Sequence, residues 1–515
     1  MTLHISDHYP AKRGLFLCLA LIVGLACNRQ APAALYFQDG FNYTAGTVLA
    51  GNGAWTNAYS LITVGNGNLT YLGLTDTSPA GNDAAVAANP NAGASSSTFW
   101  TASPFGTAPS SGVVYAAFLL KYTGMMLVLL LVLILTVIFW FYLMAPVYDF
   151  PEPKPFSGSA LYNPYEGLDS LNWRRANFQV QSRAWGGLTD GRKNSNEEID
   201  SVYRSLEYEV IATSDYMKIN RWGEDLETFI PVYEHGYGTN KWHQVVIGAR
   251  RVNWIDFPLG QSLSHKQYIL DVLRENSELV YIAHPRFGGG YKPDDMTWLT
   301  GYTGLEVLNY FRNSIDYWDS ALSAGRYAAL MGNDDSHDIS NPMEVGHRMT
   351  YIHSASLHGD SIVAALKANR AYGADIFRTR EETMQEKIAK IPSIARFRYA
   401  RLCGDTLKVA VDKTAASFRF IGQGGKEKGR MENVSEAWYV FRSDDTYIRT
   451  EIHFADKNVL HLNPVVRCNP NEIPGNPPLA TVNIYKTWVY RVLLLASLIF
   501  IILNIVFLRL KLFKK

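Results

Sequence analysis

An uncharged apolar run, Met125–Ala145, constrains this chain more than any other feature of its sequence. The run reads MMLVLLLVLILTVIFWFYLMA and contains no Asp, Glu, Lys or Arg. About 20 such residues span the hydrocarbon core of a bilayer. Trp140 and Tyr142 lie near one end, where aromatic belts form. The run therefore predicts a transmembrane helix at residues 125–145, with a buried core helix as the alternative.

A second apolar run, Val492–Leu508, lies near the other end of the chain. Basic residues flank it on both sides: Lys486 and Arg491 before it, and Arg509, Lys511, Lys514 and Lys515 after it. A basic cluster next to a span favours the cytoplasmic side. We therefore expect a second span at residues 492–508 with a cytoplasmic tail. Residues 146–486 would then be extracytoplasmic, between two helices of the inner (cell) membrane.

The chain begins with a signal-like segment at residues 1–29. Lys12 and Arg13 precede the apolar run Gly14–Cys27, a charged region followed by an apolar region of the length expected of a signal peptide. A short buried helix is the alternative interpretation.

Residues 30–120 are almost uncharged, with Asp39, Asp76 and Asp83 as the only charged side chains. Short alternating runs, Ser60–Val64 and Asn68–Leu72, are bounded by Gly and Asn and predict β-strands. In composition this segment resembles the start of a lectin-like jelly roll.

The predicted topology conflicts with an exported first segment. A cleaved signal would export residues 30–120, and the span at 125–145 would return residues 146–486 to the cytoplasm. The basic tail would then lie outside, against the charge bias. Either the first apolar run is not a working signal, or residues 1–120 are joined to an unrelated membrane protein. We favour the second explanation and expect residues 1–120 to be dispensable.

Charge and cysteine content exclude several function classes. The net charge is +1 from 48 Lys+Arg and 47 Asp+Glu, so no basic field indicates nucleic-acid binding. The 4 cysteines include no CxxC pair, which excludes a zinc ribbon or a thioredoxin-like motif. Cys403 and Cys468 could form a disulfide in an oxidising compartment.

Between residues 172 and 375, short apolar runs alternate with amphipathic stretches. The predicted strands are Val210–Ser214, Gln244–Gly248, Leu279–His284 and Leu305–Asn309. The predicted helices are Asn196–Glu207, Ser264–Asn276, Ser314–Ala324 and Ser356–Asn369. This alternation predicts an α/β barrel whose chemistry lies at the carboxyl ends of the strands.

Polar residues cluster at these predicted strand ends. They are Ser214–Asp215, Glu234, His243, Ala283–Pro285, Glu306 and Gly332–Asp338. Imidazoles suit Zn, Fe or Mn, carboxylates bridge metal ions, and a bound metal acidifies water. The cluster therefore indicates a metal-dependent hydrolase, with simple hydrogen bonding in a barrel mouth as the alternative.

The pattern resembles the PHP (polymerase and histidinol phosphatase) domain family. The motifs that carry the resemblance are Thr189-Asp190-Gly191, Thr213-Ser214-Asp215-Tyr216, Glu234 with His243, Ala283-His284-Pro285, Asp335-Ser336-His337 and Ala371-Tyr372. The resemblance implies a distorted (β/α)7 barrel at residues 172–375 and a metal-dependent phosphoesterase activity. The sequence also departs from the family pattern, because Gln179, Gln181 and Tyr216 stand where the family has histidines.

The resemblance implies particular site residues. The implied metal ligands are Glu234, His243, His284, Asp190, Asp335 and His337, and the implied catalytic residues are Asp335 and His337. Arg183, Arg286 and Arg348 are candidates to bind the phosphate of a phosphorylated small-molecule substrate, because a guanidinium matches phosphate oxygens.

The substitutions imply a weakened metal centre. An amide oxygen is a poor ligand for Zn, Mn or Fe, so Gln179 and Gln181 imply fewer ions than usual, held by Glu234, His243 and His284. Two functions remain open: a membrane-anchored hydrolase with a degraded metal centre, and a non-catalytic pseudoenzyme that binds a ligand or partner.

A β-rich stretch follows at residues 395–468. Alternating runs such as Leu407–Val411, Ser417–Ile421 and Tyr447–Ile452 are separated by turn signals at Gly404 and at Gly422–Gly425. They predict a small antiparallel β-sandwich. The Pro-rich stretch Pro470–Pro478 predicts a stiff linker to the last span.

Overall fold

The structure is a computed structural model that describes residues 62–64, 84–86, 130, 133–189, 191, 193–238, 240–470, 474 and 478–512. The chain divides into two compact units, residues 1–134 and 135–515. In the first unit, β1 (Ile62–Val64) pairs antiparallel with β2 (Ala84–Val86). β1 falls within the strand predicted at Ser60–Val64. The predicted signal-like segment, the strand at Asn68–Leu72 and most of the jelly-roll-like segment lie outside the described residues.

Helices occupy part of the first predicted membrane span and all of the second. Residues 133–144 are helical, and α9 spans Ile484–Leu512. Residues 125–129 and 131–132 of the first predicted span lie outside the described residues. Within the described part of the chain, no helix combines the length and apolar character needed to cross a membrane.

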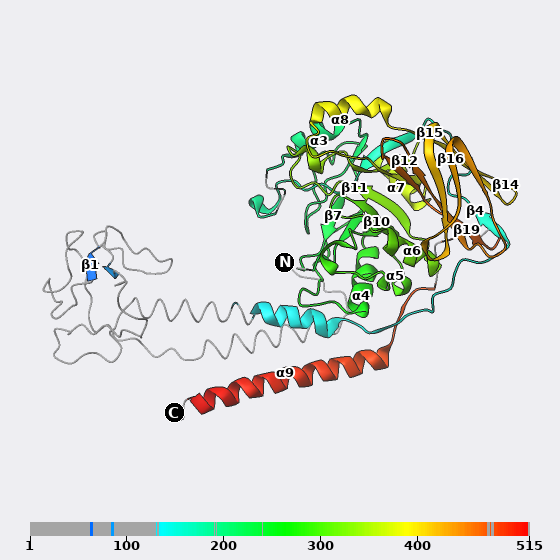
Figure 1. The fold of residues 1–515 in the computed structure, drawn as a ribbon. Coiled ribbons are helices and arrows are strands. Elements are labelled where there is room, and N and C mark those ends of the chain that lie inside the picture. Colours follow the sequence, from blue (N-terminus) through cyan, green and yellow to red (C-terminus); the bar gives the residue numbers. More distant parts are fainter. Residues whose placement is uncertain are drawn as a thin grey trace, which may run out of the picture. The chain divides into compact units, whose positions relative to one another are not determined.

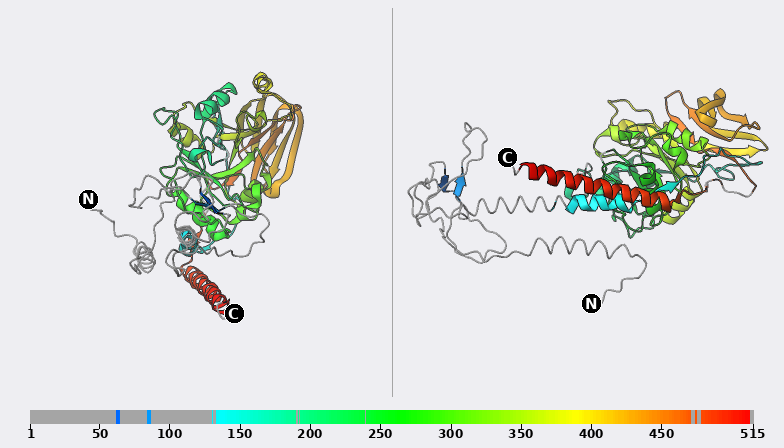
Figure 2. Two further views of the ribbon diagram at one scale, coloured as in Figure 1. Left: turned by 90° about the vertical axis from the view of Figure 1, so that its left-hand side faces the viewer. Right: turned by 90° about the horizontal axis from the view of Figure 1, so that it is seen from below.

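The end of the helix at 133–144 lies next to the start of α9 (Figures 1 and 2). Arg491 of α9 donates hydrogen bonds to the last carbonyls of the other helix, those of Leu143 and Met144. Next to them, β3 (Tyr148–Asp149) pairs antiparallel with β20 (Thr481–Val482). These contacts join the start and the end of the intervening chain.

A five-stranded sheet, ordered β11-β10-β9-β8-β7, forms the centre of the second unit. Its strands are β7 (Val232–His235), β8 (Gln244–Ile247), β9 (Leu279–Ile282), β10 (Gly304–Asn309) and β11 (Ala329–Asn333). β9, β10 and β11 run parallel, whereas β8 is antiparallel to β7 and to β9. Every residue of these strands is buried, as expected of a sheet that is covered on both faces.

The two faces of this sheet pack against different helices. Successive side chains of a strand point to opposite faces. Val280 of β9 packs in one core with α4 (Leu263–Arg274) and α6 (Ile315–Ser323). Its neighbour Tyr281 packs in another core with α7 (Gly359–Lys367).

The predicted alternation of helices and strands is confirmed for residues 196–369. The four predicted helices correspond to α3 (Asn196–Ser205), α4, α6 and α7. The four predicted strands correspond to β6 (Val210–Ile211), β8, β9 and β10. Two further helices, α5 (Asp295–Trp298) and α8 (Met384–Lys390), were not predicted.

The remaining strands form a second, larger sheet of 11 strands. Its members are β4 (Ala160–Tyr162), β5 (Trp173–Asn177), β6, β12 (Arg348–His353), β13 (Ala371–Asp375), β14 (Phe397–Cys403), β15 (Thr406–Gly422), β16 (Lys426–Val440), β17 (Tyr447–His453), β18 (Val459–Leu462) and β19 (Val465–Cys468). The predicted antiparallel pairing after residue 395 is present. These strands share a sheet with the α/β part, because β13 pairs antiparallel with β18.

The expected closed barrel is not present among the described residues. Among the described residues, the backbone pairing between the two sheets is limited to isolated bridges, Val180 with Ser336 and Tyr216 with Glu234. Side chains replace ladder hydrogen bonds at this junction. For example, the Asp334 amide donates to Asn177 Oδ1 at 3.0 Å. The second unit is thus a mixed α/β structure of two contacting sheets.

The disulfide considered as a possibility for an oxidising compartment is not present, since Cys403 and Cys468 are not bridged to each other. Cys403 is exposed and Cys468 is buried. Each lies at the end of a different strand, β14 and β19, and these two strands do not pair with each other.

Candidate metal centre

Three potential metal ligands, Glu234, His243 and His284, converge at one edge of the central sheet. Glu234 belongs to β7, His243 directly precedes β8, and His284 follows β9 after Ala283. The antiparallel pairing of β7 with β8 and of β8 with β9 brings these positions together. Three residues that are separated along the chain therefore lie close together in the folded protein.

The geometry of the three side chains fits a transition metal. One ligand atom of each lies within 4.8 Å of those of the other two. Glu234 Oε1 is 2.5 Å from His243 Nδ1 and 3.3 Å from His284 Nε2, and all three residues are buried. A carboxylate and two imidazoles suit Zn, Mn or Fe, and three protein ligands leave a position open for water.

Burial and charge set the protonation of this triad. Burial favours the neutral form of Glu234, but the adjacent His243 and His284 hold the pKa of Glu234 well below its ordinary value. Burial lowers the pKa of His243. Burial also acts to lower the pKa of His284, but its hydrogen bond to Glu234 and the charge of Asp335 prevail and raise that pKa to about 9. Because a ligand imidazole must be neutral, metal binding would displace the proton of His284.

The two glutamines lie in the same interior. Gln181 donates from Nε2 to Glu234 Oε2 at 2.7 Å. Gln181 Oε1 and both polar side-chain atoms of Gln179 are buried and have no hydrogen-bond partner among the described residues. Buried polar atoms are normally paired, so these atoms fit a site that holds a water molecule or an ion.

Asp335 and His337 come from the loop after β11. Asp335 Oδ2 lies 3.9 Å from His284 Nε2 and accepts a hydrogen bond from Asn309 Nδ2 at 3.2 Å. His337 Nε2 is 3.2 Å from the hydroxyl of Tyr216. The structure thus brings Asp335 beside the triad and pairs His337 with Tyr216.

Glu306 of β10 is a further buried carboxyl group of this site. Burial, with the charge of Asp335 adding to it, raises the pKa of Glu306 to about 8. Glu306 accepts hydrogen bonds from the His284 amide at 2.8 Å and from Asn309 and Asn333 at 3.0 Å each. Burial also raises the pKa of Asp335, to about 6. Through the hydrogen bond from the His284 amide, Glu306 positions the backbone that carries His284.

Two site residues have left-handed backbone conformations. His284 has φ of 26° and Asp335 has φ of 50°. Such conformations are costly for residues other than glycine and are concentrated at functional sites. Both strained positions belong to the site, since His284 is a triad residue and Asp335 lies beside it.

The other acidic residues of the motifs have different positions. Asp190, an expected ligand, lies outside the described residues. Asp215 is buried, and its carboxylate accepts hydrogen bonds from Ser182 Oγ at 2.8 and 2.9 Å and from Asn220 Nδ2 at 3.0 Å. Asp215 thus fixes the loop before Tyr216.

The three candidate arginines are not gathered around the triad's ligands. Arg183 is exposed. Arg286 forms an ion pair with Asp316, and Arg348 forms one with Asp375. The charges of Arg286 and Arg348 are therefore already matched by carboxylates, and a role in phosphate binding stays a prediction.

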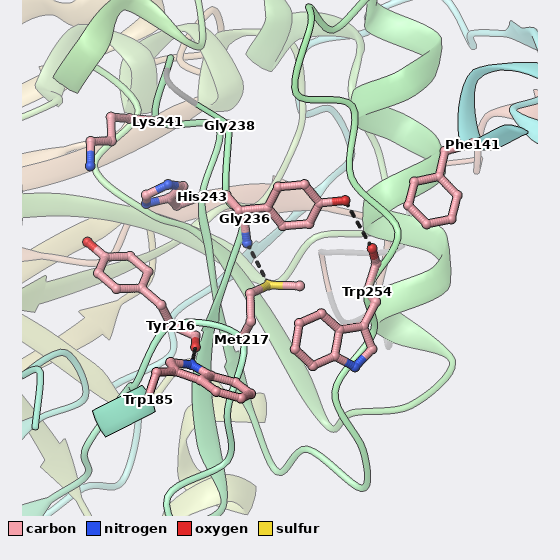
Figure 3. Close-up of a pocket in the computed structure, with 10 residues that line it drawn as sticks. Phe141, Trp185, Tyr216, Met217, Gly236, Gly238, Lys241, His243 and Trp254 are labelled. Atoms are coloured by element: carbon pink, nitrogen blue, oxygen red, sulfur yellow. Dashed lines mark hydrogen bonds between the residues drawn. The ribbon is translucent and has the colours of Figure 1, made fainter. Parts of the chain in front are cut away.

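A cavity of about 690 Å³ lies beside the triad (Figure 3). Its lining residues are Phe141, Trp185, Tyr216, Met217, Gly236, Tyr237, Gly238, Lys241, His243 and Trp254. Of these residues, only Tyr216 and His243 could be recognised from the sequence as site residues. Most of the other lining residues lie in loops, which have no periodic pattern in the sequence. The sequence feature that could have indicated the cavity is the pair of glycines, Gly236 and Gly238, between β7 and His243.

Comparisons with known proteins give one similar solved structure. No family model matches the chain, and no curated protein matches it. The solved structure is a two-domain protein containing a predicted PHP-like metal-dependent phosphoesterase from Bacteroides vulgatus ATCC 8482. The likeness has 12% sequence identity and a TM-score of 0.30, and it covers 65% of this chain and 99% of that one. The chemistry that we assign to the site is therefore argued from the residues of this chain and not from this likeness.

Proposed function

We propose that the second unit is a divalent-metal-dependent hydrolase of phosphate esters. The observation that carries the proposal is the buried triad Glu234, His243 and His284, whose ligand atoms lie within 4.8 Å of one another. A bound Zn, Mn or Fe ion would polarise a phosphoryl oxygen and lower the pKa of a bound water molecule. The chain's own residues bind and orient the reactants.

We assign to Asp335 and His337 the role of orienting water and substrate. Asp335 Oδ1 is buried and has no hydrogen-bond partner among the described residues, so it can accept a proton or a hydrogen bond from water. The Tyr216 hydroxyl and His337 Nε2 form a second polar pair next to His243. Proton transfer at Asp335 Oδ1 is the role that we assign to this side of the site.

We also propose that the centre holds fewer ions than a PHP domain with its full set of histidines. Gln179 and Gln181 offer amides in place of imidazoles. Gln181 already uses its amide nitrogen to bind Glu234. Tyr216 similarly interacts with His337. One ion at the triad is the stoichiometry that these contacts favour.

Metal titration of the purified full-length protein tests this proposal. Isothermal titration calorimetry with Zn²⁺ and Mn²⁺ should give about one site per chain, and His284→Ala should abolish it. His358→Ala is the matched control, because His358 is exposed and caps α7 away from the triad. Hydrolysis of p-nitrophenyl phosphate should depend on the added metal. Two or more tight ions with rapid hydrolysis would contradict the single-ion centre.

A non-catalytic binding function is the second candidate. The unpaired amide atoms of Gln179 and Gln181 favour it, since amides suit hydrogen-bonded recognition of a ligand. Metal or ligand binding without turnover of any phosphate ester would support this candidate over the hydrolase.

We further propose that the protein is anchored in the inner membrane with the second unit outside the cytoplasm. The support comes from the sequence: the uncharged run at 125–145 and the basic residues after 508. Alkaline phosphatase fused after Pro474 should be active in cells. Activity of a cytoplasmic reporter at the same position would contradict this orientation.

A further inference from the structure

The cavity beside the triad has a polar end and an aromatic end (Figure 3). Lys241 and His243 lie at the polar end, with the hydroxyl of Tyr216. Trp254 and Phe141 lie toward the other end. A single ligand that fills the cavity must therefore match two different chemistries.

Lys241 provides the charge at the polar end. It forms no ion pair with any carboxylate among the described residues, and its Nζ lies 6.0 Å from the centre of the Tyr216 ring. That ring lies 5.5 Å from the ring of His243. A lysine ammonium next to a metal site is suited to an anionic headgroup such as a phosphate.

Two tryptophans provide apolar surface at the other end. The rings of Trp185 and Trp254 lie 5.9 Å apart, and these residues are 44% and 52% exposed. Hydrogen bonds hold both loops: Trp185 Nε1 donates to the Tyr216 carbonyl at 2.8 Å, and the Tyr237 hydroxyl donates to the Trp254 carbonyl at 3.3 Å. Fixed, half-exposed indoles are suited to bind an apolar group.

We propose that the substrate is an amphiphilic phosphate ester whose apolar chain lies against Trp185 and Trp254 while its phosphate lies at Lys241 and the triad. This inference rests on the proposed hydrolase function and adds the class of substrate. A small hydrophilic ester would leave the indoles exposed to water. A neutral apolar ligand would leave Lys241 without a counter-charge. The ester is either soluble or membrane-borne, since both share this chemistry.

A series of alkyl phosphates tests the inference by binding, without turnover. Butyl, hexyl and octyl phosphate are titrated calorimetrically into the metal-free full-length protein, below their micelle concentrations. Affinity should rise about fourfold for each added methylene that is buried. Trp254→Gln should flatten this dependence on chain length. Lys241→Met should weaken all three esters by a similar factor and leave the dependence intact.

Controls separate the two ends of the cavity. Trp438→Gln, an exposed tryptophan on β16, should leave every affinity unchanged. If Trp254→Gln loses its folded circular dichroism spectrum, Trp185→Gln replaces it. Inorganic phosphate binding as tightly as octyl phosphate would refute the apolar end. Octyl glucoside binding as tightly would refute the anionic end.

The outcome also separates this inference from the proposed hydrolase. Chain-length-dependent binding in a protein that neither binds metal nor hydrolyses esters would refute the hydrolase alone. Metal-dependent hydrolysis with no effect of chain length would refute the amphiphilic substrate alone. Octyl phosphate in phosphatidylcholine vesicles distinguishes the two sources: binding only from vesicles indicates a membrane-borne ester, and binding in neither form refutes the inference.

Discussion

Gly236 lies so close to His243 that no side chain fits between them. A Cβ atom on Gly236 would lie 2.7 Å from His243 Cδ2, and the φ of Gly236 is 117°. The position therefore needs glycine for two reasons, close approach and backbone conformation. The absence of a side chain at Gly236 therefore leaves the space that the imidazole of His243 occupies in the triad.

Replacing Gly236 by alanine should displace His243 and weaken metal binding by about tenfold or more, as loss of a positioning contact does in other metal sites. Calorimetric titration with Zn²⁺ measures the effect. Gly260→Ala is the control: φ there is 146°, but no atom lies within 4 Å of the added Cβ, so only backbone strain is introduced. Equal metal affinities in the two variants would contradict this explanation.

His461 on β18 is a second residue whose environment makes a measurable prediction. Burial lowers its pKa to about 4, from the ordinary 6.5. The charged groups around it are Glu451 and Asp375, which act to raise the pKa, and Arg449 and His453, which act to lower it. The imidazole is therefore buried in its neutral form.

The sign of the pH effect follows from this depressed pKa. Above pH 6.5 His461 is neutral in both states; as the pH falls toward 4, only the unfolded chain takes up the proton, and stability is lost. Between pH 8 and pH 5 the loss should be about 2 kcal/mol. His461→Gln should remove that part of the loss in urea unfolding. An unchanged pH dependence in the variant would show that His461 is not buried as a neutral group.

At the scale of elements, helix α3 has a clear start signal. Ser195 accepts a hydrogen bond from the Glu198 amide, and the Glu198 side chain accepts one from the Ser195 amide. Such a capping box satisfies two backbone donors that a helix start otherwise leaves unpaired. Its residues directly follow the loop that carries Trp185.

Replacing Ser195 by alanine should lower the free energy of unfolding by about 1 kcal/mol. Ser201→Ala, at an exposed interior position of the same helix, should be neutral or slightly stabilising, because alanine is the better helix former. Urea unfolding of both variants measures the difference. If Ser201→Ala lowered the free energy of unfolding as much as Ser195→Ala, the effect would not come from the capping box.

Elements with strong local periodicity could be predicted from the sequence. α4 and α6 bury apolar side chains at helical spacing, and the predicted ranges agree with them within a few residues. β7 and β11 were not predicted; both contain polar site residues, Glu234 in β7 and Asn333 in β11, next to only a few apolar residues. The pairing of β13 with β18 joins distant parts of the chain, so no local pattern could reveal it.

In the candidate site, too, some residues could be predicted from the sequence and others depend on tertiary contacts. The triad could be predicted because Glu234, His243 and His284 match motifs of the family that the sequence resembles. The aromatic end of the cavity could not, because Trp185 and Trp254 come together only through the folding of two loops. The partners of Arg286 and Arg348 likewise depend on tertiary contacts.

At the scale of the whole molecule, a buried ion pair joins the larger sheet to helix α6, which covers the five-stranded sheet. Arg449 of β17 donates to both carboxylate oxygens of Asp319 on α6, at 2.6 and 2.8 Å, and also to Glu451 at 2.6 Å. Arg449 is 2% exposed. We therefore expect the α/β part and the strands after residue 395 to unfold together (Figure 1).

Replacing Arg449 by methionine should lower the stability by about 3 kcal/mol or more, because two carboxylates lose their buried partner. Arg419→Met is the control, since that side chain is 32% exposed in its ion pairs. Scanning calorimetry should show one transition for the second unit in the wild type. Two separate transitions would show that the parts unfold independently.

A truncated chain that starts at Lys121 should retain the melting temperature of the second unit. The reason is that residues 1–134 form a compact unit distinct from 135–515. Differential scanning calorimetry of full-length and truncated protein in detergent provides the comparison. A large drop in melting temperature would show that the first unit contributes to the stability of the second.

The clasp formed by β3, β20 and Arg491 has a mechanical consequence. Lys486 also pairs with Asp149 there, at 2.6 Å. A force that separates the helix at 133–144 from α9 acts on these contacts, because they link the end of the first helix to the start of the second. Tension between the helices would therefore load the clasp, and it would also reach the cavity beside the triad, because Phe141 of the first helix lines that cavity.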